Sequence, residues 1–424
     1  MKIAWVGGVG LGGGVGSLGT MLMEAVLQKG ISIDFYGDAA DISDSLKSKS
    51  NLHIISTPPY WSWNRWYSKN PFAAFLTGTY ARVNAYNRQS DKLIEQNRLS
   101  KYDCIFQLSQ IELFKLANYT HELPPIISYP CVHAAGELYW HQKERSYALQ
   151  SENFFKHYIT RAYLYHRSSV QKKSMRKPAI VIGMSNRFNE LISVDYSIPP
   201  SRQAILYQPV RALDSKIIEV SEKLCQTRKK IRMLLVARIS VRKGIQYIVE
   251  LSHRLDDLAD EIQIDVIGDR SQWSDYRSHL KDLNARTANY LGGMKHEDVS
   301  EAYQNSDILL APSVYEPGGI VVGEALSYGL CVVASDAIGS AEMISSPCLR
   351  EFKAGDMDGF ENAVRGMVAD LQTNRQVLRQ EARRQSILNY SPDNMADNFI
   401  EIIERVVPVN DRKESRKTLS PGNI

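Results

Sequence analysis

Short runs of apolar residues alternate with longer amphipathic segments along most of this chain. In the first half, apolar runs predict strands at residues 2–8, 31–37, 52–57, 104–110, 125–133 and 179–185. The second half repeats the pattern at residues 232–238, 262–268, 288–293, 307–313 and 331–336. Helical periods lie between the runs, for example over 244–258 and 296–306. Strands that alternate with helices indicate βαβ units built around a parallel sheet.

The doubled pattern predicts the domain organisation. A break falls near residues 197–214, and 424 residues are enough for two domains. We therefore expect an α/β protein with two doubly wound, Rossmann-like domains of similar size, residues 1–208 and 209–390. The final residues, 410–424, are polar and aperiodic, a composition that predicts a disordered tail.

Composition narrows the class of protein. The formal net charge of +4 is too small to imply nucleic acid by itself, and no nucleic-acid-binding motif supports that partner. The five cysteines have no metal-ligand spacing, which favours buried thiols in a reducing compartment. Residues 3–23 carry no charge, but eight of them are glycine, which disfavours the helix of a signal peptide or a membrane span. We therefore expect a cytoplasmic protein without a transmembrane segment.

A dense run of glycine, GGVGLGGGVGSLG, follows the first predicted strand at residues 7–19. Two segments of the run match G-x-G-x-x-G, and Asp34 lies in the next predicted strand, about where a nicotinamide-ribose acid belongs. An NAD(P)-dependent oxidoreductase is therefore one interpretation. A second is a loop whose backbone approaches the phosphate of another ligand, because glycine lacks a Cβ and adopts positive φ. A third is a flexible connection between a strand and a helix.

The most informative stretch is SVYEPGGIVVGEALSYGLCVVASD, residues 313–336. It predicts a strand end, Glu316, a Gly318-Gly319 loop, a helix that carries Glu324, and another strand. A helix N-terminus preceded by glycines presents free N–H groups and a positive dipole end, which suit a diphosphate. The Glu324 carboxylate has only acceptors and can take both hydroxyls of a ribose. Glu316, at the strand end, could accept from a second sugar.

A pair of cations follows the first predicted strand of the second half. Arg238 and Lys243 flank a turn in VARISVRKG, at the strand end where open α/β sheets bind ligands. Two cations at this place can neutralise a nucleotide diphosphate and stabilise it as a leaving group. A solvated basic turn is the alternative for this segment taken alone.

Together these segments resemble the retaining glycosyltransferases of family 4, which have the GT-B architecture of two facing Rossmann-like domains with a cleft between them. EPGGIVVGEAL resembles the Glu-x7-Glu motif of that family, and Arg238 and Lys243 have the spacing of its diphosphate-binding pair. YPCVHAAGE places His133 where the family has an active-site histidine. LGGMKHEDVSEAYQNSDILLAPS is similar to the segment that brackets the nucleobase. YSPDNMADNFIEIIERV resembles a C-terminal helix that returns to the first domain, so we expect residues 391–409 to do so.

The resemblance implies a set of site residues. The catalytic group would comprise Glu316, His133, Arg238 and Lys243. The donor-binding group would comprise Gly13, Gly14, Gly293, Met294, Gly318, Gly319, Ile320 and Glu324. Where the family often has an aromatic residue this chain has Gly318, which leaves the packing of the sugar ring open.

The activity implied is the transfer of a hexose from a nucleotide diphosphate sugar to a hydroxyl of a glycan, glycolipid or other acceptor. The resemblance implies retention of configuration, no metal and no cofactor, in the assembly of bacterial-type polysaccharide, lipopolysaccharide or glycolipid. A nucleotide-sugar epimerase or a non-catalytic nucleotide-sugar binder on the same fold is the alternative to a transferase.

Two segments of the first half combine aromatic and basic residues. One contains Trp61, Trp63 and Trp66. The other, residues 154–189, has no acidic residue and includes Lys172 and Lys173. Amphipathic aromatics beside cations suit a lipid interface, such as the inner face of the cell membrane, or an anionic acceptor. A solvated helix and a packed aromatic loop explain the two segments equally well.

Overall fold

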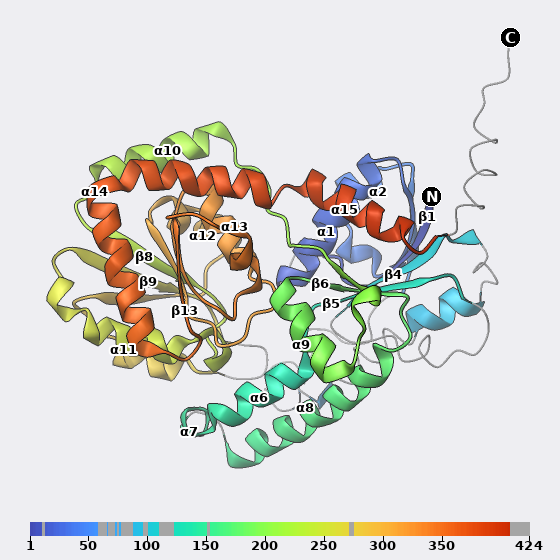
Figure 1. Cartoon of the computed structure of the whole chain (residues 1–424), viewed down its shortest axis with the longest axis horizontal. Helices are drawn as coiled ribbons and strands as arrows, with labels where there is room; N and C mark the ends of the chain where they lie inside the picture. Colours follow the sequence, from blue (N-terminus) through green and yellow to red (C-terminus); the bar gives the residue numbers. More distant parts are fainter. Residues whose placement is uncertain are drawn as a thin grey trace, which may run out of the picture.

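A computed structural model describes residues 1–10, 13–57, 66, 73, 76–77, 88–95, 101–109, 123–150, 153–270 and 275–407. The chain forms two α/β domains, which lie side by side in Figure 1. Each domain has one sheet in which every described pair of strands is parallel. The prediction of a two-domain, parallel α/β fold is therefore confirmed.

The first sheet has seven strands in the order β3-β2-β1-β4-β5-β6-β7. Its strands are β1 (Lys2–Val6), β2 (Ser32–Gly37), β3 (Leu52–Ser56), β4 (Cys104–Ser109), β5 (Ile126–Pro130), β6 (Ile180–Gly183) and β7 (Gln203–Ile205). The helices described with it are α1 (Gly13–Gln28), α2 (Asp44–Lys47), α6 (Ala134–Lys143), α7 (Arg145–Ala148), α8 (Phe154–Ser174), α9 (Asn186–Tyr196) and α15 (Pro392–Glu404).

The second sheet has six strands in the order β10-β9-β8-β11-β12-β13. Its strands are β8 (Ile231–Val236), β9 (Ile262–Ile267), β10 (Ala288–Gly292), β11 (Ile308–Ala311), β12 (Cys331–Ser335) and β13 (Leu349–Phe352). Its helices are α10 (Ser215–Thr227), α11 (Ile245–Arg254), α12 (His296–Gln304), α13 (Ile320–Ser327) and α14 (Met357–Asn389). The central strands are nearly all apolar because helices cover both faces of the sheet, as in other parallel sheets.

The C-terminal helix α15 packs on the first domain, next to α1 (Figure 1). Phe399 of α15 lies in the core of that domain, where its ring centroid is 4.6 Å from that of Phe106 and 6.3 Å from that of Trp5. The chain therefore crosses between the domains twice. The two crossings are joined by a hydrogen bond from the Val210 N–H to the Tyr390 carbonyl, at 2.9 Å.

The glycine run after β1 forms a close contact between the β1–α1 loop and helix α1. Gly7 and Gly8 have φ values of 73° and 68°, which favour glycine. A Cβ at Gly19 would lie 1.8 Å from the carbonyl oxygen of Gly8, so the helix can approach the loop only without a side chain there. Gly14 has no neighbouring atom within 4 Å of its Cβ position. Close packing thus explains why residue 19 is a glycine, but it does not explain why residue 14 is one.

We expect Gly19→Ala to destabilise the first domain, because the new methyl group collides with backbone and overpacking of this kind costs about 1–3 kcal/mol. Thermal unfolding should show a lower melting temperature for Gly19→Ala. The matched control is Gly14→Ala, which adds a methyl group in open space on the same helix and should melt no lower than the wild type. Equal melting of Gly19→Ala and the wild type would contradict this packing.

Candidate active site

The carboxyl edges of the two sheets face each other. Ser185, which follows β6, donates a hydrogen bond through its hydroxyl to the carbonyl of Pro317, which follows β11, at 3.1 Å. The ring of His133, after β5, lies 6.0 Å from that of Tyr315. Loops at this edge of open α/β sheets commonly bind ligands. The candidate site therefore lies where the loops after β8, β11 and β12 meet the first domain.

Glu316 is the centre of an ion cluster at this edge. Its Oε2 accepts a hydrogen bond from Arg242 Nη1 at 3.0 Å and another from Lys243 Nζ. Only 15% of the Glu316 side chain is exposed. Burial opposes ionisation, but the charges of Lys243 and Arg242 outweigh it and hold the pKa of Glu316 below its ordinary value. Glu316 is therefore a carboxylate at neutral pH.

The two cations come from one turn. Val241–Lys243 form a short 3-10 helix, η4, in the loop after β8, and Gly244, with φ 75°, is the N-cap residue of α11. Burial, with the nearby positive charges of Arg242 and Arg238, lowers the pKa of Lys243. Arg242 also donates to the Tyr315 carbonyl at 3.0 Å. It therefore holds both the Glu316 side chain and the backbone of the loop after β11.

Arg238 was predicted to act together with Lys243 and lies elsewhere on the same turn. Its side chain is exposed, and within the described ranges it forms no ion pair. Arg242, which the sequence analysis passed over, lies beside Glu316. Arg238 nevertheless contributes to the positive potential around Lys243. The structure thus brings three cations to the turn, with two of them bound to Glu316.

Gly318 and Gly319 connect Glu316 to helix α13, which begins at Ile320. Gly319 is the N-cap residue with φ 101°, a conformation that favours glycine. A Cβ at Gly318 would lie 2.6 Å from Oε1 of Gln208, in the segment that links the domains. The first-turn N–H groups of a helix have no acceptors within it and suit an anion. The predicted diphosphate-binding loop therefore adjoins the ion cluster.

Glu324 lies on α13 and is partly buried. Its Oε2 accepts a hydrogen bond from the hydroxyl of Tyr303 at 3.1 Å. The rings of Tyr303 and Tyr328 stack with their centroids 5.3 Å apart. Burial raises the pKa of Tyr303 well above its ordinary range, so this phenol stays a donor. The two glutamates therefore have different partners, cations for Glu316 and a phenol for Glu324.

Gly293 and Met294 follow β10 at the far side of the same edge. Both are exposed, Met294 at 37%. A Cβ at Gly293 would lie 2.9 Å from the Cβ of Asp269, which follows β9. These residues therefore lie at the carboxyl edge of the second sheet, and no described contact joins them to Glu316.

His133 is fully buried, as the N-cap residue of α6. Its Nε2 lies 2.7 Å from Oδ2 of Asp195, and its ring packs edge-on against Tyr196 with centroids 5.2 Å apart. Burial lowers the pKa of His133 despite the Asp195 carboxylate, so the ring is neutral at neutral pH. Its Nε2 faces the first domain rather than the Glu316 cluster.

Other predicted residues have different surroundings. Gly13 and Gly14 begin α1 at the carboxyl edge of the first sheet. Trp61 and Trp63 lie outside the described residues, whereas Trp66 is 76% exposed. Lys172 and Lys173 are exposed in the last turn of α8.

Asp34, the residue on which the oxidoreductase interpretation depended, lies in the middle of β2. Its carboxylate accepts a hydrogen bond from the Tyr102 hydroxyl at 2.7 Å and lies 3.0 Å from Lys2 Nζ. Only 3% of Asp34 is exposed. The Asp34 carboxylate is thus bound by Tyr102 and Lys2 within the first domain.

Comparisons with known proteins match the part of the chain that holds most of these residues. Residues 217–385 match the family "Glycosyl transferases group 1", and this range holds the cation turn, Glu316 and α13. The chain is 30% identical to the sulfoquinovosyl transferase SQD2 of Arabidopsis thaliana over 156 residues, covering 36% of this chain and 29% of SQD2. It is 26% identical to the alpha-maltose-1-phosphate synthase of Mycolicibacterium smegmatis over 185 residues, covering 40% of this chain and 47% of the synthase.

Solved structures share the fold over nearly the whole chain. The sucrose-phosphate synthase of Thermosynechococcus elongatus is similar with a TM-score of 0.66 and 16% identity, covering 95% of this chain and 98% of that one. Anabaena HepE is similar with a TM-score of 0.60 and 14% identity, covering 96% of this chain and 100% of HepE. The two domains therefore form a GT-B fold, as predicted.

The similarity to group 1 glycosyl transferases thus lies in the second domain. The matched region covers less than half the length of the curated relatives named above. None of these matches supports an oxidoreductase.

We expect Arg242→Gln to shift the acid limb of the pH profile of kcat upward. A carboxylate with a depressed pKa stays ionised until the pH falls through that value, so removing one cation moves the loss of charge on Glu316 to higher pH. The lost charge-assisted hydrogen bond is worth about 1.5–3 kcal/mol. The control, Arg350→Gln, breaks a more exposed ion pair with Asp370 on α14 and should leave the profile unchanged. If the acid limb of Arg242→Gln lies at the same pH as that of the wild type, Arg242 does not hold down the pKa of Glu316.

Proposed function

We propose that this protein is a retaining glycosyltransferase that moves a hexose from a nucleotide diphosphate sugar to an acceptor hydroxyl. The observation that carries the proposal is the ion cluster of Glu316, Lys243 and Arg242 beside the N-terminus of α13. A carboxylate, cations and a helix N-terminus in one place can address a sugar and a diphosphate together. The match of residues 217–385 to group 1 glycosyl transferases supports this assignment.

The donor would lie along the carboxyl edge of the second sheet. Its diphosphate would bind Lys243, Arg238 and the first turn of α13, including Ile320. The ribose hydroxyls would bind the Glu324 carboxylate. The hydrogen bond from the Tyr303 hydroxyl would keep that carboxylate oriented. The nucleobase would lie near Gly293 and Met294, and Gly13 and Gly14 would approach the diphosphate from the first domain. HepE has been solved with UDP and glucose, so UDP-glucose is the first donor to test.

The chemistry follows from these positions. The bond between the anomeric carbon and the diphosphate oxygen breaks, and a bond from that carbon to the acceptor oxygen forms on the same face. The acceptor proton passes to the departing phosphate oxygen, whose negative charge Lys243 and Arg238 stabilise. Glu316 would stabilise the positive charge that develops on the sugar ring. We propose that no metal or cofactor takes part, since cations of the chain would neutralise the leaving group.

His133 acts as a positioning residue in this proposal. Its ring packs beside Tyr315, the neighbour of Glu316, while Asp195 holds its Nε2. The acceptor would enter from the first domain, and we propose a glycan or glycolipid in the assembly of polysaccharide, lipopolysaccharide or glycolipid. WaaG, a glycosyltransferase involved in lipopolysaccharide biosynthesis, shares the fold with a TM-score of 0.63.

Lys243→Ala should weaken nucleotide diphosphate binding. Because the variant loses a charge-assisted contact worth about 1.5–3 kcal/mol, affinity should fall about tenfold or more in calorimetry with UDP or GDP. Lys230→Ala, which removes an amine bound to the Ala259 carbonyl at the opposite end of β8, is the control and should bind as the wild type does. Unchanged affinity of Lys243→Ala for every nucleotide diphosphate would place the donor elsewhere.

Substitutions at the two glutamates should have different kinetic effects. Glu316→Gln removes a charge that helps the transition state more than the ground state, so kcat should fall more than the donor KM rises. Glu324→Gln weakens a ribose contact present in substrate and leaving group alike, so it should reduce affinity for the nucleotide with and without its sugar. Steady-state kinetics with the correct donor, alongside calorimetry with the bare nucleotide, would measure both effects.

Two outcomes would overturn the proposal. If Glu316→Gln transfers sugar at the wild-type rate, the assignment of Glu316 is wrong. If the wild-type protein binds a nucleotide sugar and transfers it to no acceptor or water, a non-catalytic binder replaces the enzyme.

A further inference from the structure

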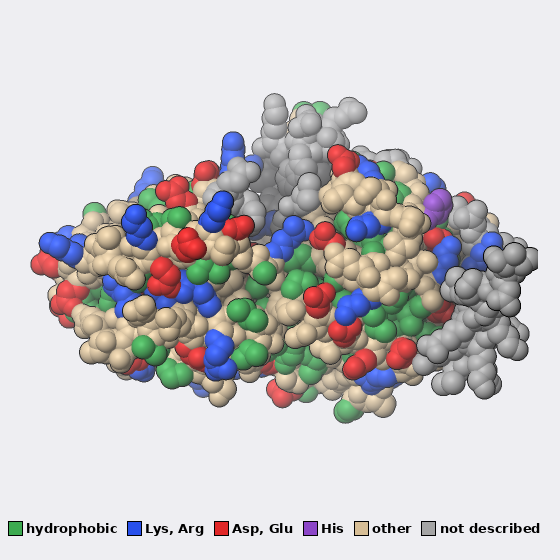
Figure 2. Space-filling model, turned by 90° about the horizontal axis from the view of Figure 1, so that it is seen from above, with side chains coloured by type: hydrophobic (Ala, Val, Ile, Leu, Met, Phe, Trp, Pro, Cys, Tyr) green, Lys and Arg blue, Asp and Glu red, His purple; other side chains and the backbone are tan. Residues whose placement is uncertain are grey.

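Helix α8 has an unusual charge composition. Its 21 residues include no aspartate or glutamate, whereas its last turn carries Lys172 and Lys173 and is followed by Arg176 and Lys177. These four cations are exposed and form no ion pair with any residue that the structure describes. By contrast, blue and red side chains are interspersed over the face of the molecule seen in Figure 2.

One face of α8 is fixed to the first domain. The buried residues His157, Leu164 and Gln171 are spaced seven apart and so lie on one side of the helix. The His157 ring stacks on that of His141 in α6, with centroids 4.2 Å apart. Gln171 donates to the Val132 carbonyl at 2.6 Å and accepts from the Ala134 N–H at 2.9 Å. The helix is therefore held in place with a defined outward face.

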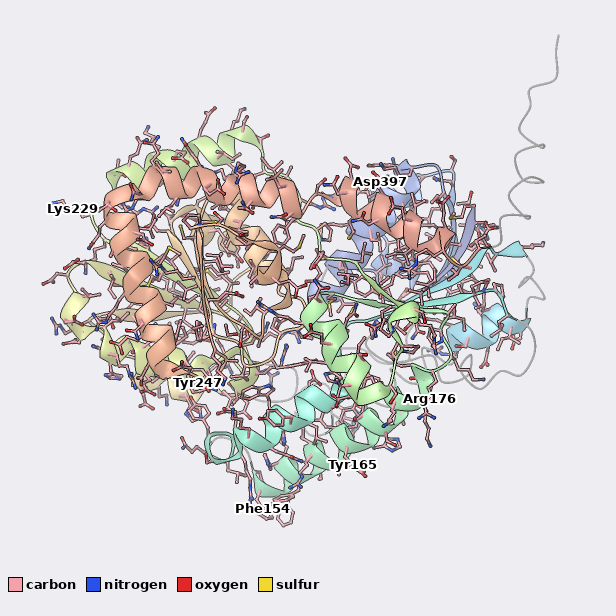
Figure 3. All side chains as sticks on the ribbon, in the orientation of Figure 1. Phe154, Tyr165, Arg176, Lys229, Tyr247 and Asp397 are labelled. Atoms are coloured by element: carbon pink, nitrogen blue, oxygen red, sulfur yellow. The ribbon has the colours of Figure 1, made fainter. Side chains whose placement is uncertain are left out.

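The outward face is apolar at its start and basic at its end. Phe154, Phe155 and Tyr165 are 56%, 75% and 72% exposed, which is unusual for large aromatic side chains. Phe154, Tyr165 and Arg176 follow one another along the outer edge of the first domain in Figure 3. A helix of this length spans about 30 Å. Aromatic rings and unpaired cations thus share one long, straight surface.

Three carboxylates on the neighbouring elements have partners that lie away from this surface. Glu137 of α6 lies 3.6 Å from Arg167, on the side of α8 that faces α6. Glu144, at the end of α6, accepts a hydrogen bond from the Tyr247 hydroxyl of the second domain at 3.4 Å. Asp195 of α9 faces His133. The positive charge at the end of α8 is therefore not neutralised by these residues.

We propose that the outward face of α8 binds the surface of an anionic lipid bilayer. Exposed Phe and Tyr rings gain free energy by entering the region between headgroups and acyl chains, and nearby cations are attracted to anionic headgroups. The helix lies on the bilayer rather than across it, since no helix in the described part of the chain is long and apolar enough to span a membrane. If the proposed transferase activity holds, this surface would bring the site to a lipid-linked acceptor.

Flotation with vesicles tests the proposal on the full chain. Vesicles of phosphatidylcholine alone are compared with vesicles that contain phosphatidylglycerol as well. The wild type should float with the anionic vesicles, and the fraction bound should fall as salt is added. Lys172→Gln/Lys173→Gln should reduce the partition coefficient about thirtyfold, because each cation near an anionic surface contributes about 1 kcal/mol. Phe155→Ser should reduce the partition coefficient about tenfold, because the variant lacks a ring that the wild type would bury in the bilayer.

Matched controls change similar residues elsewhere. Lys223→Gln/Lys229→Gln removes two exposed lysines from the second domain, where Figure 3 places Lys229 far from α8. Val377→Ser replaces a side chain of α14 that is 66% exposed. Both controls should float like the wild type.

The proposal is overturned by any of three results: no wild-type binding to anionic vesicles, equal binding to both compositions, or unimpaired binding of the α8 variants. It is also overturned if Phe155→Ser abolishes self-association in sedimentation instead, because the face would then join two copies of the chain. No sugar donor is present, so these outcomes are independent of the transferase activity.

Discussion

The Glu316 carboxylate, held by Lys243 and Arg242, is the interaction on which the geometry of the second domain's site depends. A largely buried carboxylate is tolerated only with opposite charges close by, and loss of one partner of such a pair costs about 3–5 kcal/mol. The cluster ties the turn after β8 to the loop after β11. A parallel bridge between Glu316 and Ile338 adds the loop after β12. The Glu316 carboxylate therefore joins two strand ends, and the backbone of the same residue joins a third.

The same loop couples the site to the arrangement of the domains. A Cβ at Gly136 would lie 2.6 Å from the Tyr315 ring, so glycine at this place lets Tyr315 reach α6 of the first domain. Glu342, after β12, accepts hydrogen bonds from the N–H groups of Asn186 at 2.5 Å and Arg187 at 3.1 Å at the start of α9. A shift of the domains would therefore move the neighbours of Glu316 and alter the space for a donor.

The sequence predicted much of the fold because buried parallel strands are continuous apolar runs. Each strand predicted from such a run is present, whereas β7 and β13 were missed. β7 has only three residues, and β13 (LREF) has two charged residues between its apolar ends. Arg242 was missed because spacing along a turn cannot tell which of its cations will contact a carboxylate that a distant loop supplies. The partner of His133 could not be predicted either, since Asp195 lies more than sixty residues away and is brought close only by folding.

The most direct test of the account is a crystal structure of the protein with a bound nucleotide diphosphate. The account predicts the diphosphate at the N-terminus of α13 within hydrogen-bond distance of Lys243, and the ribose hydroxyls on Glu324. A nucleotide held instead only by the glycine loop after β1, with Lys243 and Glu324 free of contact with it, would contradict the central claim that the carboxyl edge of the second sheet is the donor site.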